Sequence, residues 1–317
     1  MLTAFLTTLE QMLRIVLFLA IGFGMNKLHI LPKGASSGIS KLATTLFLPA
    51  MLLHSNMTEF NLADVATYGQ IVMLGVVLWT VVTIPCIWIA NRLSGGDYNE
   101  RGVYLYGLSF PNSGAIGRPL ALAIAGTVGL FQYNLFLLMY VIMTYAWGVG
   151  LFLNGESKHP IKRFFVGLIN PVFLSMLAGL ILGALGSRNW MPPVITQVVG
   201  DLGDCFVPVS LLMAGYAVAD YPFGEVLKRP KSYIFTALRL LIIPLGVMFA
   251  LRFAGVSKEL TTLVLFALSS PSGMNVVVFP AAYGRDCKTG ASIVLMSCLG
   301  AIITMPLLYA LLQVIYS

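Results

Sequence analysis

The feature that most constrains this chain is a series of long apolar runs joined by short polar links. A transmembrane helix needs roughly 20 mostly apolar residues, the length that crosses the hydrocarbon layer of a bilayer. The runs that meet this requirement cover residues 6–26, 38–57, 66–90, 102–125, 130–153, 163–186, 194–219, 232–254, 260–282 and 289–313. We therefore expect an all-α integral membrane protein with ten transmembrane helices.

The composition agrees with a location in the lipid bilayer. Hydrophobic residues make up 58% of the chain and charged residues only 10%, whereas a soluble domain carries roughly 25% charged residues. Such a chain has too few polar side chains to cover a water-facing surface. The formal net charge of +7 does not indicate a nucleic-acid partner, because the distribution of Lys and Arg between the links has a simpler explanation.

Cytoplasmic links of membrane proteins carry an excess of Lys and Arg, so these residues predict the orientation. If the N-terminus lies outside, the outer links hold only Arg188, Arg252 and Lys258. The inner links and the adjoining run ends then hold Lys27, Lys33, Lys41, Arg92, Arg101, Lys158, Lys162, Arg163, Lys228, Arg229, Lys231, Arg285 and Lys288. We expect a multi-pass protein of the cell (inner) membrane with both termini outside.

Short similarities within the chain predict an internal repeat. Each pair is separated by about 160 residues and keeps the same order: LFLPAMLL (46–53) with CFVPVSLL (205–212), LSFPNSG (108–114) with LSSPSGM (268–274), and GMNKLHILP (24–32) with GALGSRNWMP (183–192). We expect two five-helix repeats, residues 1–157 and 158–317. Because five is odd, the second repeat is inverted in the membrane, which is a common plan of secondary transporters.

The fourth and ninth runs are each interrupted near the middle by proline and polar residues. The stretch SFPNSGAIGRPL contains Pro111 and Pro119, and Pro271 interrupts the ninth run. A mid-helix proline removes a backbone donor, and freed backbone groups are tolerated in a membrane only where they line a cavity or are buried in protein. We predict two broken helices that cross, with half-helix N-termini that favour an anion. The alternative is that each proline only kinks its helix.

These residues resemble the auxin efflux carrier family, and the resemblance covers the whole chain. It rests on Pro111-Asn112-Ser113, Gly117, Pro119-Leu120, Pro271-x-Gly273, Val278-Phe279, Tyr283 and the LFLPAMLL segment around Pro49. The resemblance implies a scaffold of runs 1, 2, 6 and 7, which forms a homodimer, and a moving transport unit of runs 3–5 and 8–10. It implies organic anions as substrates: indole-3-acetate in plants, and malonate or malate in some bacterial relatives. The short link at 154–162 is typical of a prokaryotic-type member.

The polar residues beside the two breaks are expected to bind the substrate. An asparagine can donate to a carboxylate, and the resemblance places Asn112 against the substrate. Asn112 could instead cap the second half of its helix, and its counterpart Asn275 could instead join the two crossing segments. The expected substrate contacts are Asn112, Ser113, Arg118, Tyr140, Ser272, Gly273, Met274 and Asn275, with Leu48, Pro49, Met51, Leu52 and Pro208 facing them from the scaffold.

Arg118 is an arginine inside a transmembrane run, where it costs roughly 3 kcal/mol on insertion scales. It could pair with a substrate carboxylate through two parallel hydrogen bonds. The plant members carry an apolar residue here, so the departure favours a smaller or doubly charged anion over indole-3-acetate. The alternatives are that Arg118 snorkels to the interface or pairs with a carboxylate of the protein.

Other polar residues in the runs each allow two interpretations. Asp201 and Asp204 could couple transport to sodium or protons, or could simply favour the start of their helix through its dipole. Arg14 and Arg239 could snorkel or pair with one of these aspartates. His54 could titrate near neutral pH or pack in the core.

The chain contains no HExxH, CxxC, GxGxxG or P-loop motif, so we expect neither an enzyme nor a cofactor or metal site. The predicted function is a secondary transporter of small organic anions that works by alternating access, with the lipid bilayer and the anion as its partners. A sodium-coupled symporter of the bile-acid type is the alternative. A sensor that binds a carboxylate without moving it is a further alternative.

Overall fold

The structure is a computed structural model that describes residues 2–32, 34–152, 169–219, 224, 228–282 and 285–316. Every regular element in this described part of the chain is helical, which confirms the predicted all-α class. The predicted boundary between the two repeats, at residues 157 and 158, lies outside the described residues. So do Lys33, Lys158, Lys162, Arg163 and Tyr283.

The first half begins with one long helix and continues with helices that are interrupted. Its elements are α1 (Leu2–Lys27), α2 (Ala35–Leu42), η1 (Ala43–Phe47), α3 (Leu48–Glu59), η2 (Leu62–Asp64), α4 (Val65–Ser94), α5 (Tyr98–Ser109), η3 (Ser113–Gly117), α6 (Arg118–Phe136), α7 (Leu138–Ala146) and η4 (Gly148–Phe152). Gly126 has a positive φ of 67° inside α6, a conformation that glycine adopts without steric cost. The chain therefore turns at Gly126, at the end of the fourth predicted run.

The second half contains α9 (Pro171–Ala184), α10 (Ser187–Trp190), α11 (Pro193–Asp204), α12 (Phe206–Val218), α14 (Pro230–Ala237), η5 (Leu238–Ile242), α15 (Ile243–Phe253), α16 (Lys258–Ser269), α17 (Asn275–Ala282) and α18 (Lys288–Ile315). Across the described residues, seven helical stretches are long and apolar enough to cross a membrane: Leu9–Lys27, Ala35–Glu59, Leu62–Ser94, Ser113–Phe136, Pro193–Ala217, Pro230–Phe253 and Lys288–Ile315. The chain is thus a multi-pass membrane protein, while ten spans and an inverted repeat remain predictions.

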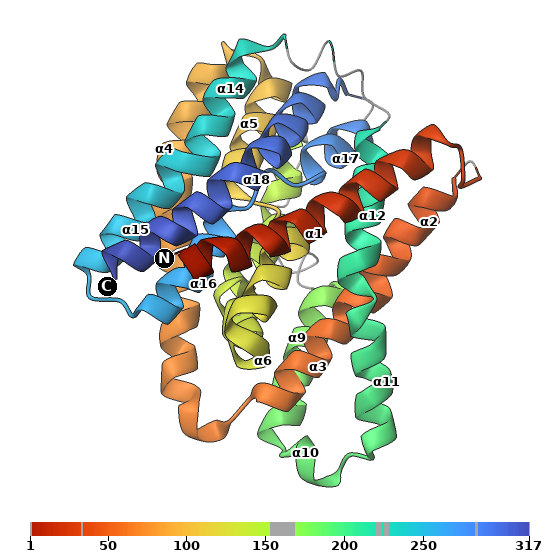
Figure 1. Cartoon of the computed structure of the whole chain (residues 1–317), viewed down its shortest axis with the longest axis vertical. Coiled ribbons are helices and arrows are strands. Elements are labelled where there is room, and N and C mark those ends of the chain that lie inside the picture. The colour runs from red at the N-terminus through yellow and green to blue at the C-terminus, as the bar shows by residue number, and fades with distance from the viewer. Residues whose placement is uncertain are drawn as a thin grey trace.

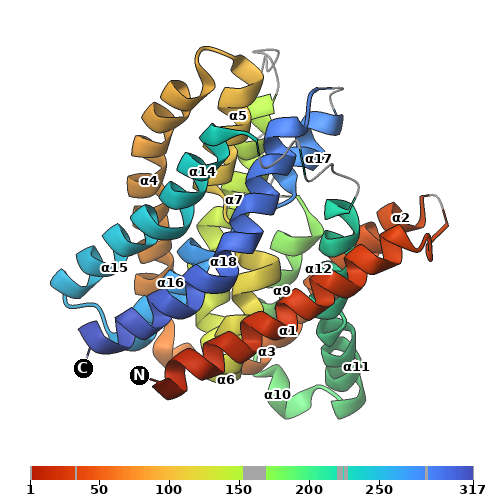
Figure 2. The same cartoon turned by 45° about the horizontal axis from the view of Figure 1, so that its top comes forward.

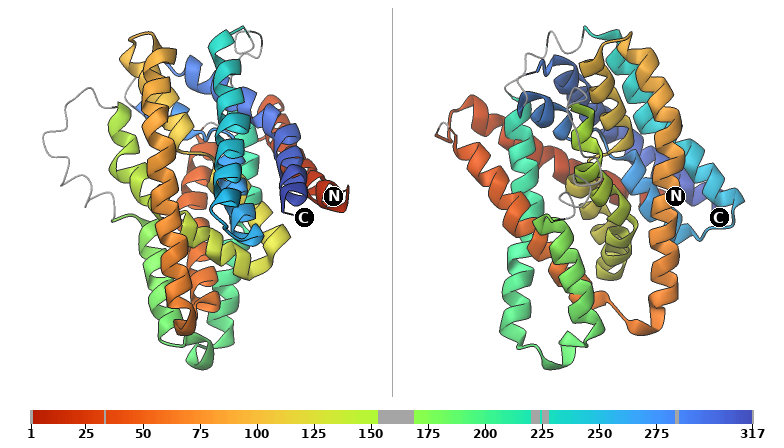
Figure 3. Two further views of the ribbon diagram at one scale, coloured as in Figure 1. Left: turned by 90° about the vertical axis from the view of Figure 1, so that its left-hand side faces the viewer. Right: turned by 180° about the vertical axis from the view of Figure 1, so that it is seen from behind.

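The helices can be divided into two groups that are in contact with each other. The first group consists of α1, α3, α9, α11 and α12, and the second of α4, α5, α6, α7 and α14–α18; they meet mainly where α1 packs against α18. Figure 1 shows α3, α9 and α11 together at the lower right and α4, α14 and α15 at the left, with α1 running diagonally across the molecule. Figures 2 and 3 show that α1 lies beside α12 and that the two termini are close to one another.

Three helices contain one turn of π-helix directly before a proline. The turns are η1, η3 and η5, and the prolines that follow are Pro49, Pro119 and Pro244, each at the second residue of the next helix. A proline lacks the N–H that would bond to the carbonyl four residues earlier, and its ring clashes with that carbonyl. A wider turn relieves this clash, and such turns occur frequently at functional sites.

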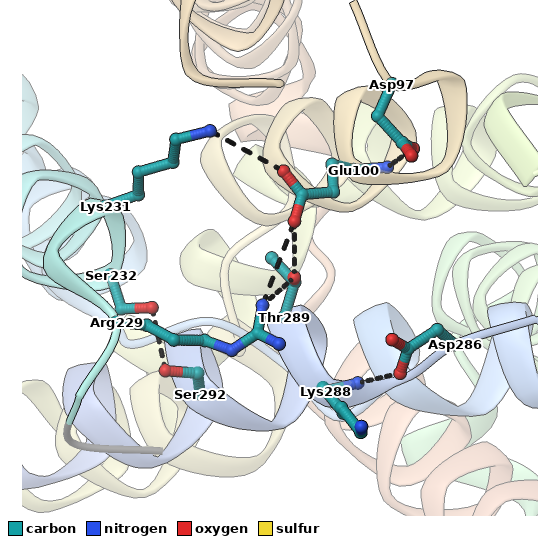
Figure 4. Close-up of polar contacts among 9 residues, drawn as sticks. All are labelled: Asp97, Glu100, Arg229, Lys231, Ser232, Asp286, Lys288, Thr289 and Ser292. Atoms are coloured by element: carbon teal, nitrogen blue, oxygen red, sulfur yellow. Dashed lines mark hydrogen bonds and ion pairs between the residues drawn. The ribbon is translucent and has the colours of Figure 1, made fainter. Parts of the chain in front are cut away.

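Polar side chains join the first turns of α5, α14 and α18 (Figure 4). The Glu100 carboxylate accepts a hydrogen bond from the Thr289 hydroxyl at 3.0 Å, and Thr289 in turn accepts one from Arg229 at 2.8 Å. Arg229 and Lys231 lie 3.8 and 3.9 Å from the two carboxylate oxygens of Glu100. These contacts link three helices of the second group at one end.

Candidate functional site

The breaks in the fourth and ninth runs lie against each other. Pro111 and Ser272 form an isolated antiparallel β-bridge, and the backbone N–H of Asn112 donates to the carbonyl of Pro271 at 2.7 Å. The N–H of Ser272 donates to the hydroxyl of Ser297 at 3.0 Å. Buried backbone groups need such partners, so two segments about 160 residues apart in sequence satisfy groups that each break would otherwise leave unpaired.

A cavity of about 550 Å³, which we call the central cavity, lies at this meeting point. The segments around the two breaks border it through Pro111, Asn112, Ser113, Gly114, Arg118, Gly273, Met274 and Asn275. The other helices border it through Ser40, Lys41, Thr44, Leu48, Tyr106, Tyr140, Thr144, Phe206, Ser210 and Met213, among others. The structure therefore brings together most of the residues expected to contact the substrate.

Several predicted residues lie elsewhere. Of the scaffold residues expected to face the substrate, only Leu48 borders the central cavity. Met51 borders a second cavity instead, Leu52 is fully buried against α9, and Pro49 and Pro208 border neither cavity. Ser272 is fully buried and contributes its backbone to the meeting of the breaks.

Asn112 occupies the position before η3, yet its side chain does not accept a capping hydrogen bond from the turn that follows. It is half-buried and borders both the central cavity and a smaller apolar cavity of about 300 Å³ between α1, α12 and α18. Side-chain capping is therefore not the role of Asn112 in this structure. Its amide group is free of that role and lies at the cavity wall.

Asn275 begins α17 and donates a hydrogen bond from its side-chain amide to the hydroxyl of Tyr106 on α5 at 2.8 Å. This is the expected alternative in which Asn275 joins the two interrupted segments. Asn275 also borders the central cavity. A residue in this position can hold the segments together and still accept a hydrogen bond from, or donate one to, a bound molecule.

Arg118 is only 4% exposed and borders the central cavity. Its Nε donates to the side-chain oxygen of Asn134 at 2.9 Å. Nearby, the Tyr133 hydroxyl donates to the carbonyl of Ser113 at 3.0 Å, a contact that requires a glycine at position 117, because a Cβ there would lie 1.9 Å from that hydroxyl. The guanidinium group is thus held inside the protein and does not snorkel to the interface.

The second cavity, of about 720 Å³, lies between α1, α3, α6 and α11. Asp204, His54, Arg14 and Pro119 border it. Arg14 forms an ion pair with Glu10 at 2.7 Å rather than with either aspartate. Asp204 and His54 therefore border one cavity that is separate from the central cavity.

Asp201 and Arg239 do not form the pair that the sequence suggested as one alternative. Asp201 is exposed and its carbonyl accepts a hydrogen bond from the Cys205 thiol. Arg239 is fully buried, so it cannot snorkel to the interface, and no charged partner of Arg239 lies among the described residues. Both expectations for Arg239 are wrong, because α14, η5 and α15 turn this side chain into the protein interior.

The cavity wall also contains polar residues that the sequence interpretation did not select. Lys41 was used only for orientation, and Thr44, Thr144 and Ser210 were not singled out within their apolar runs. Hydroxyl residues in a transmembrane run are a weak signal because they also bond to the carbonyl one turn earlier, as Thr144 does with Tyr140 at 2.7 Å. Only the packing of α2, α7 and α12 shows that these residues border the same space.

The fold and the cavity define a class: a multi-pass helical membrane protein whose interrupted helices meet beside an internal cavity. A family model described as membrane transport protein matches residues 7–309. The chain belongs to this family, the auxin efflux carrier family, which confirms the resemblance seen in the sequence. Members of the family are transporters and not enzymes. A comparison with curated proteins found no match.

Proposed function

We propose that this chain is a secondary transporter of small organic anions, namely carboxylates such as malonate, malate or auxin-like acids. The observation that supports this proposal best is the meeting of two helix breaks at the central cavity, through Pro111, Asn112, Pro271 and Ser272. Secondary transporters place their substrate sites where interrupted helices meet. A purely structural kink would not need two breaks joined to each other beside a cavity.

The charge around the central cavity favours an anion. The first turns of η3 and of α17 lie at the cavity wall, beginning after Asn112 and at Asn275. Helix N-termini carry partial positive charge that attracts anions. In α17 the N–H groups of residues 276–278 already bond to carbonyls of the preceding residues, so there the dipole, rather than free N–H groups, favours an anion. Lys41 and Arg118 add two full positive charges, and no Asp or Glu is among the described residues that border the cavity.

We propose that Asn112 and Asn275 hold the carboxylate by donating from their side-chain amides, with Ser113, Tyr140, Gly273 and Met274 completing the pocket. The second group of helices then moves against the first and carries the site across the membrane. Lys41 lies in α2, at the end of the second run that the charge distribution places on the cytoplasmic side, and it borders the central cavity. In the proposed cycle this structure is therefore the inward-facing state.

Coupling and assembly are part of the same proposal. Asp204 and His54, which share the second cavity, are the candidate residues for sodium or proton coupling. The first group of helices would form the scaffold of a homodimer. Its helices α9 and α11 carry apolar side chains that the chain itself leaves exposed, including Leu174, Leu177, Val194 and Ile195, and these would contact lipid or the partner copy.

The test is to reconstitute the protein in liposomes on a solid-supported membrane and to record currents for malonate, malate, succinate, acetate and indole-3-acetate. Each acid is added with and without sodium and a proton gradient. We expect a saturable current, or saturable uptake of the radiolabelled acid where exchange is electroneutral, for at least one carboxylate. Folded protein that moves none of them would refute the proposal. A current that strictly requires sodium would favour the symporter alternative.

A further inference from the structure

Arg239 is a buried arginine whose side chain has no hydrogen-bond partner in the described part of the protein. It lies in the π-helical turn η5, its exposure is 0%, and none of its three side-chain nitrogens has a hydrogen-bond partner among the described residues. A buried cation without a partner carries a desolvation penalty of several kcal/mol. A residue that persists under this penalty inside a membrane protein is a functional candidate.

The surroundings of Arg239 supply no negative charge. The titratable groups close enough to interact with the guanidinium are Tyr140, Tyr133 and Cys86. The helices that contribute these residues, α4, α6 and α7, contain no Asp or Glu. The same holds for α14, α15 and α18, which pack against η5. The remaining helix against η5, α16, carries Glu259 in its first turn, but Glu259 is exposed and does not bond to Arg239. No carboxylate of the described residues therefore pairs with Arg239.

Four other buried polar groups on α4, α6 and α7, the helices that contribute Cys86, Tyr133 and Tyr140, also lack hydrogen-bond partners among the described residues. They are the Trp79 indole N–H, the Thr83 hydroxyl, the Asn134 amide nitrogen and the Tyr140 hydroxyl. Trp79 and Thr83 lie seven and three residues before Cys86, on the same face of α4. All four groups can donate, and the two hydroxyls can also accept, but none of the four carries negative charge.

Arg239 is connected to the central cavity through two tyrosines. Tyr140 borders that cavity, while its hydroxyl is buried, has no hydrogen-bond partner among the described residues and lies near Arg239. Tyr133 also lies near Arg239, and its hydroxyl donates to the carbonyl of Ser113, next to Asn112. The guanidinium of Arg239 does not itself border the cavity, so the tyrosine side chains lie at the boundary between the two.

We propose that Arg239 binds the second carboxylate of a dicarboxylate substrate, which reaches it when the Tyr140 side chain swings aside, while the first carboxylate stays at Asn112. This inference rests on the proposed function and narrows its substrate class to small dicarboxylates. A carboxylate supplies negative charge together with strong acceptor atoms, and no described group that bonds to Arg239 supplies either. A resident halide would supply the same charge, and the experiment separates the two sources.

The experiment measures apparent affinities for succinate and malonate, and for acetate and propionate, in liposomes containing the wild type, Arg239→Gln or Arg239→Lys. Arg252→Gln is the matched control, because Arg252 is an exposed arginine on the neighbouring helix α15. Every series is recorded in chloride and in methanesulfonate buffer. We expect Arg239→Gln to lower the affinity for dicarboxylates about tenfold, which is the effect of losing one hydrogen bond to a charged group. The affinity for monocarboxylates should fall less than about twofold. Arg239→Lys should retain part of the dicarboxylate affinity.

Three results would overturn the inference. An equal loss for both substrate classes would mean that Arg239 acts on the fold, and no loss would mean that it touches no anion. A wild type whose affinity depends on chloride, with that dependence abolished in Arg239→Gln, would assign the site to a halide. If Arg239→Gln does not fold, Arg239→Lys carries the test, and an equal change in its affinities for dicarboxylates and monocarboxylates would overturn the inference.

Asn112→Ala separates this inference from the proposed function. Suppose that Asn112→Ala lowers the affinity for both substrate classes, while Arg239→Gln leaves both affinities unchanged. The proposed anion site at Asn112 would then stand, and the inference about Arg239 would fail. If the wild type binds and moves no carboxylate, both fail together.

Discussion

The backbone N–H of Asn112 donates to the carbonyl of Pro271 across 2.7 Å, and this bond joins the break in the fourth apolar run to the break in the ninth. The side chain of Asn112 is thereby placed at the wall of the central cavity without being used as a helix cap. A position fixed by the backbone leaves the side chain free for a ligand. The predictions below test what surrounds this junction.

Asn275 can be tested for a role beyond its bond to Tyr106. Both Asn275→Ala and Tyr106→Phe remove that hydrogen bond, and each should lower stability by about 1 kcal/mol. If Asn275 also contacts the anion, Asn275→Ala should reduce transport about tenfold more than Tyr106→Phe, since one lost contact to a charged group has that size. Carboxylate currents and thermal melting of the same preparations check this. Equal transport in the two variants would restrict Asn275 to joining the segments.

Gly273 offers a probe of ligand approach that leaves the fold intact. A Cβ at this position would lie 3.7 Å from the Cβ of Asn112, an ordinary contact distance, so Gly273→Ala should fold normally. If the carboxylate approaches the backbone here, the added methyl group should lower affinity at least about tenfold. Gly246→Ala, where the Cβ would meet nothing, is the control. Normal affinity in Gly273→Ala would mean that the anion sits away from this wall.

Gly117 should be intolerant of a side chain, for a reason that a second substitution can test. In Gly117→Ala the new Cβ would lie 1.9 Å from the Tyr133 hydroxyl, and we expect a loss of roughly 1–3 kcal/mol in stability, typical of overpacking. Adding Tyr133→Phe removes the hydroxyl and should restore part of that loss. Unfolding of the two single variants and the double variant gives the coupling between the sites. Strictly additive losses would contradict the close packing of Gly117 on Tyr133.

The proposed inward-facing state predicts one-sided access to the central cavity. In a chain whose native cysteines are replaced, Thr44→Cys and Ser210→Cys should react with a water-soluble maleimide added from the cytoplasmic side, because both positions border the cavity beside Lys41. Labelling from the outside should be much slower. Protection by a transported carboxylate should slow the cytoplasmic reaction at Ser210→Cys. Faster labelling from outside would reverse the proposed orientation.

The polar contacts between α5, α14 and α18 should matter little for stability. Glu100, Arg229 and Lys231 are partly exposed, and ion pairs of this kind contribute roughly 0–1 kcal/mol. Glu100→Gln should therefore lower the melting temperature only slightly, and high salt should reduce the difference from the wild type. A large loss that salt does not change would show that the Thr289 hydrogen bond, rather than charge, holds these helices together.

The sequence predicted the class of fold and the positions of the two helix breaks, because both depend on local signals. Pro111 and Pro271 each stand beside small and polar residues, a combination that marks a break, whereas Pro85 and Pro306 lie inside continuous helices. The run lengths predict membrane helices. It did not predict which scaffold residue faces the cavity. Leu48 does and Pro49 does not, since one residue along a helix turns the side chain by about 100°, and the π-turn η1 shifts that register further.

Arg239 shows a second limit of the sequence. Its position within an apolar run is compatible with snorkelling, with ion pairing or with burial, and these differ only in how neighbouring helices pack. The structure buries Arg239 near Tyr133 and Tyr140. These residues are about 100 positions away in the sequence, so no local sequence pattern could predict that they lie near each other. The same holds for Lys41, which borders the cavity only because α2 lies beside α12.

The most direct test of the central claim is the carboxylate current of Asn112→Ala compared with the wild type, at matched amounts of folded protein in the liposomes. The side chain makes no capping bond, so the variant should melt near the wild-type temperature. Asn170→Ala is the control: it removes a capping hydrogen bond to Phe173 and should lower stability without abolishing transport. We predict that Asn112→Ala reduces the current at least about tenfold. An unchanged current would contradict an anion site at the junction of the two breaks.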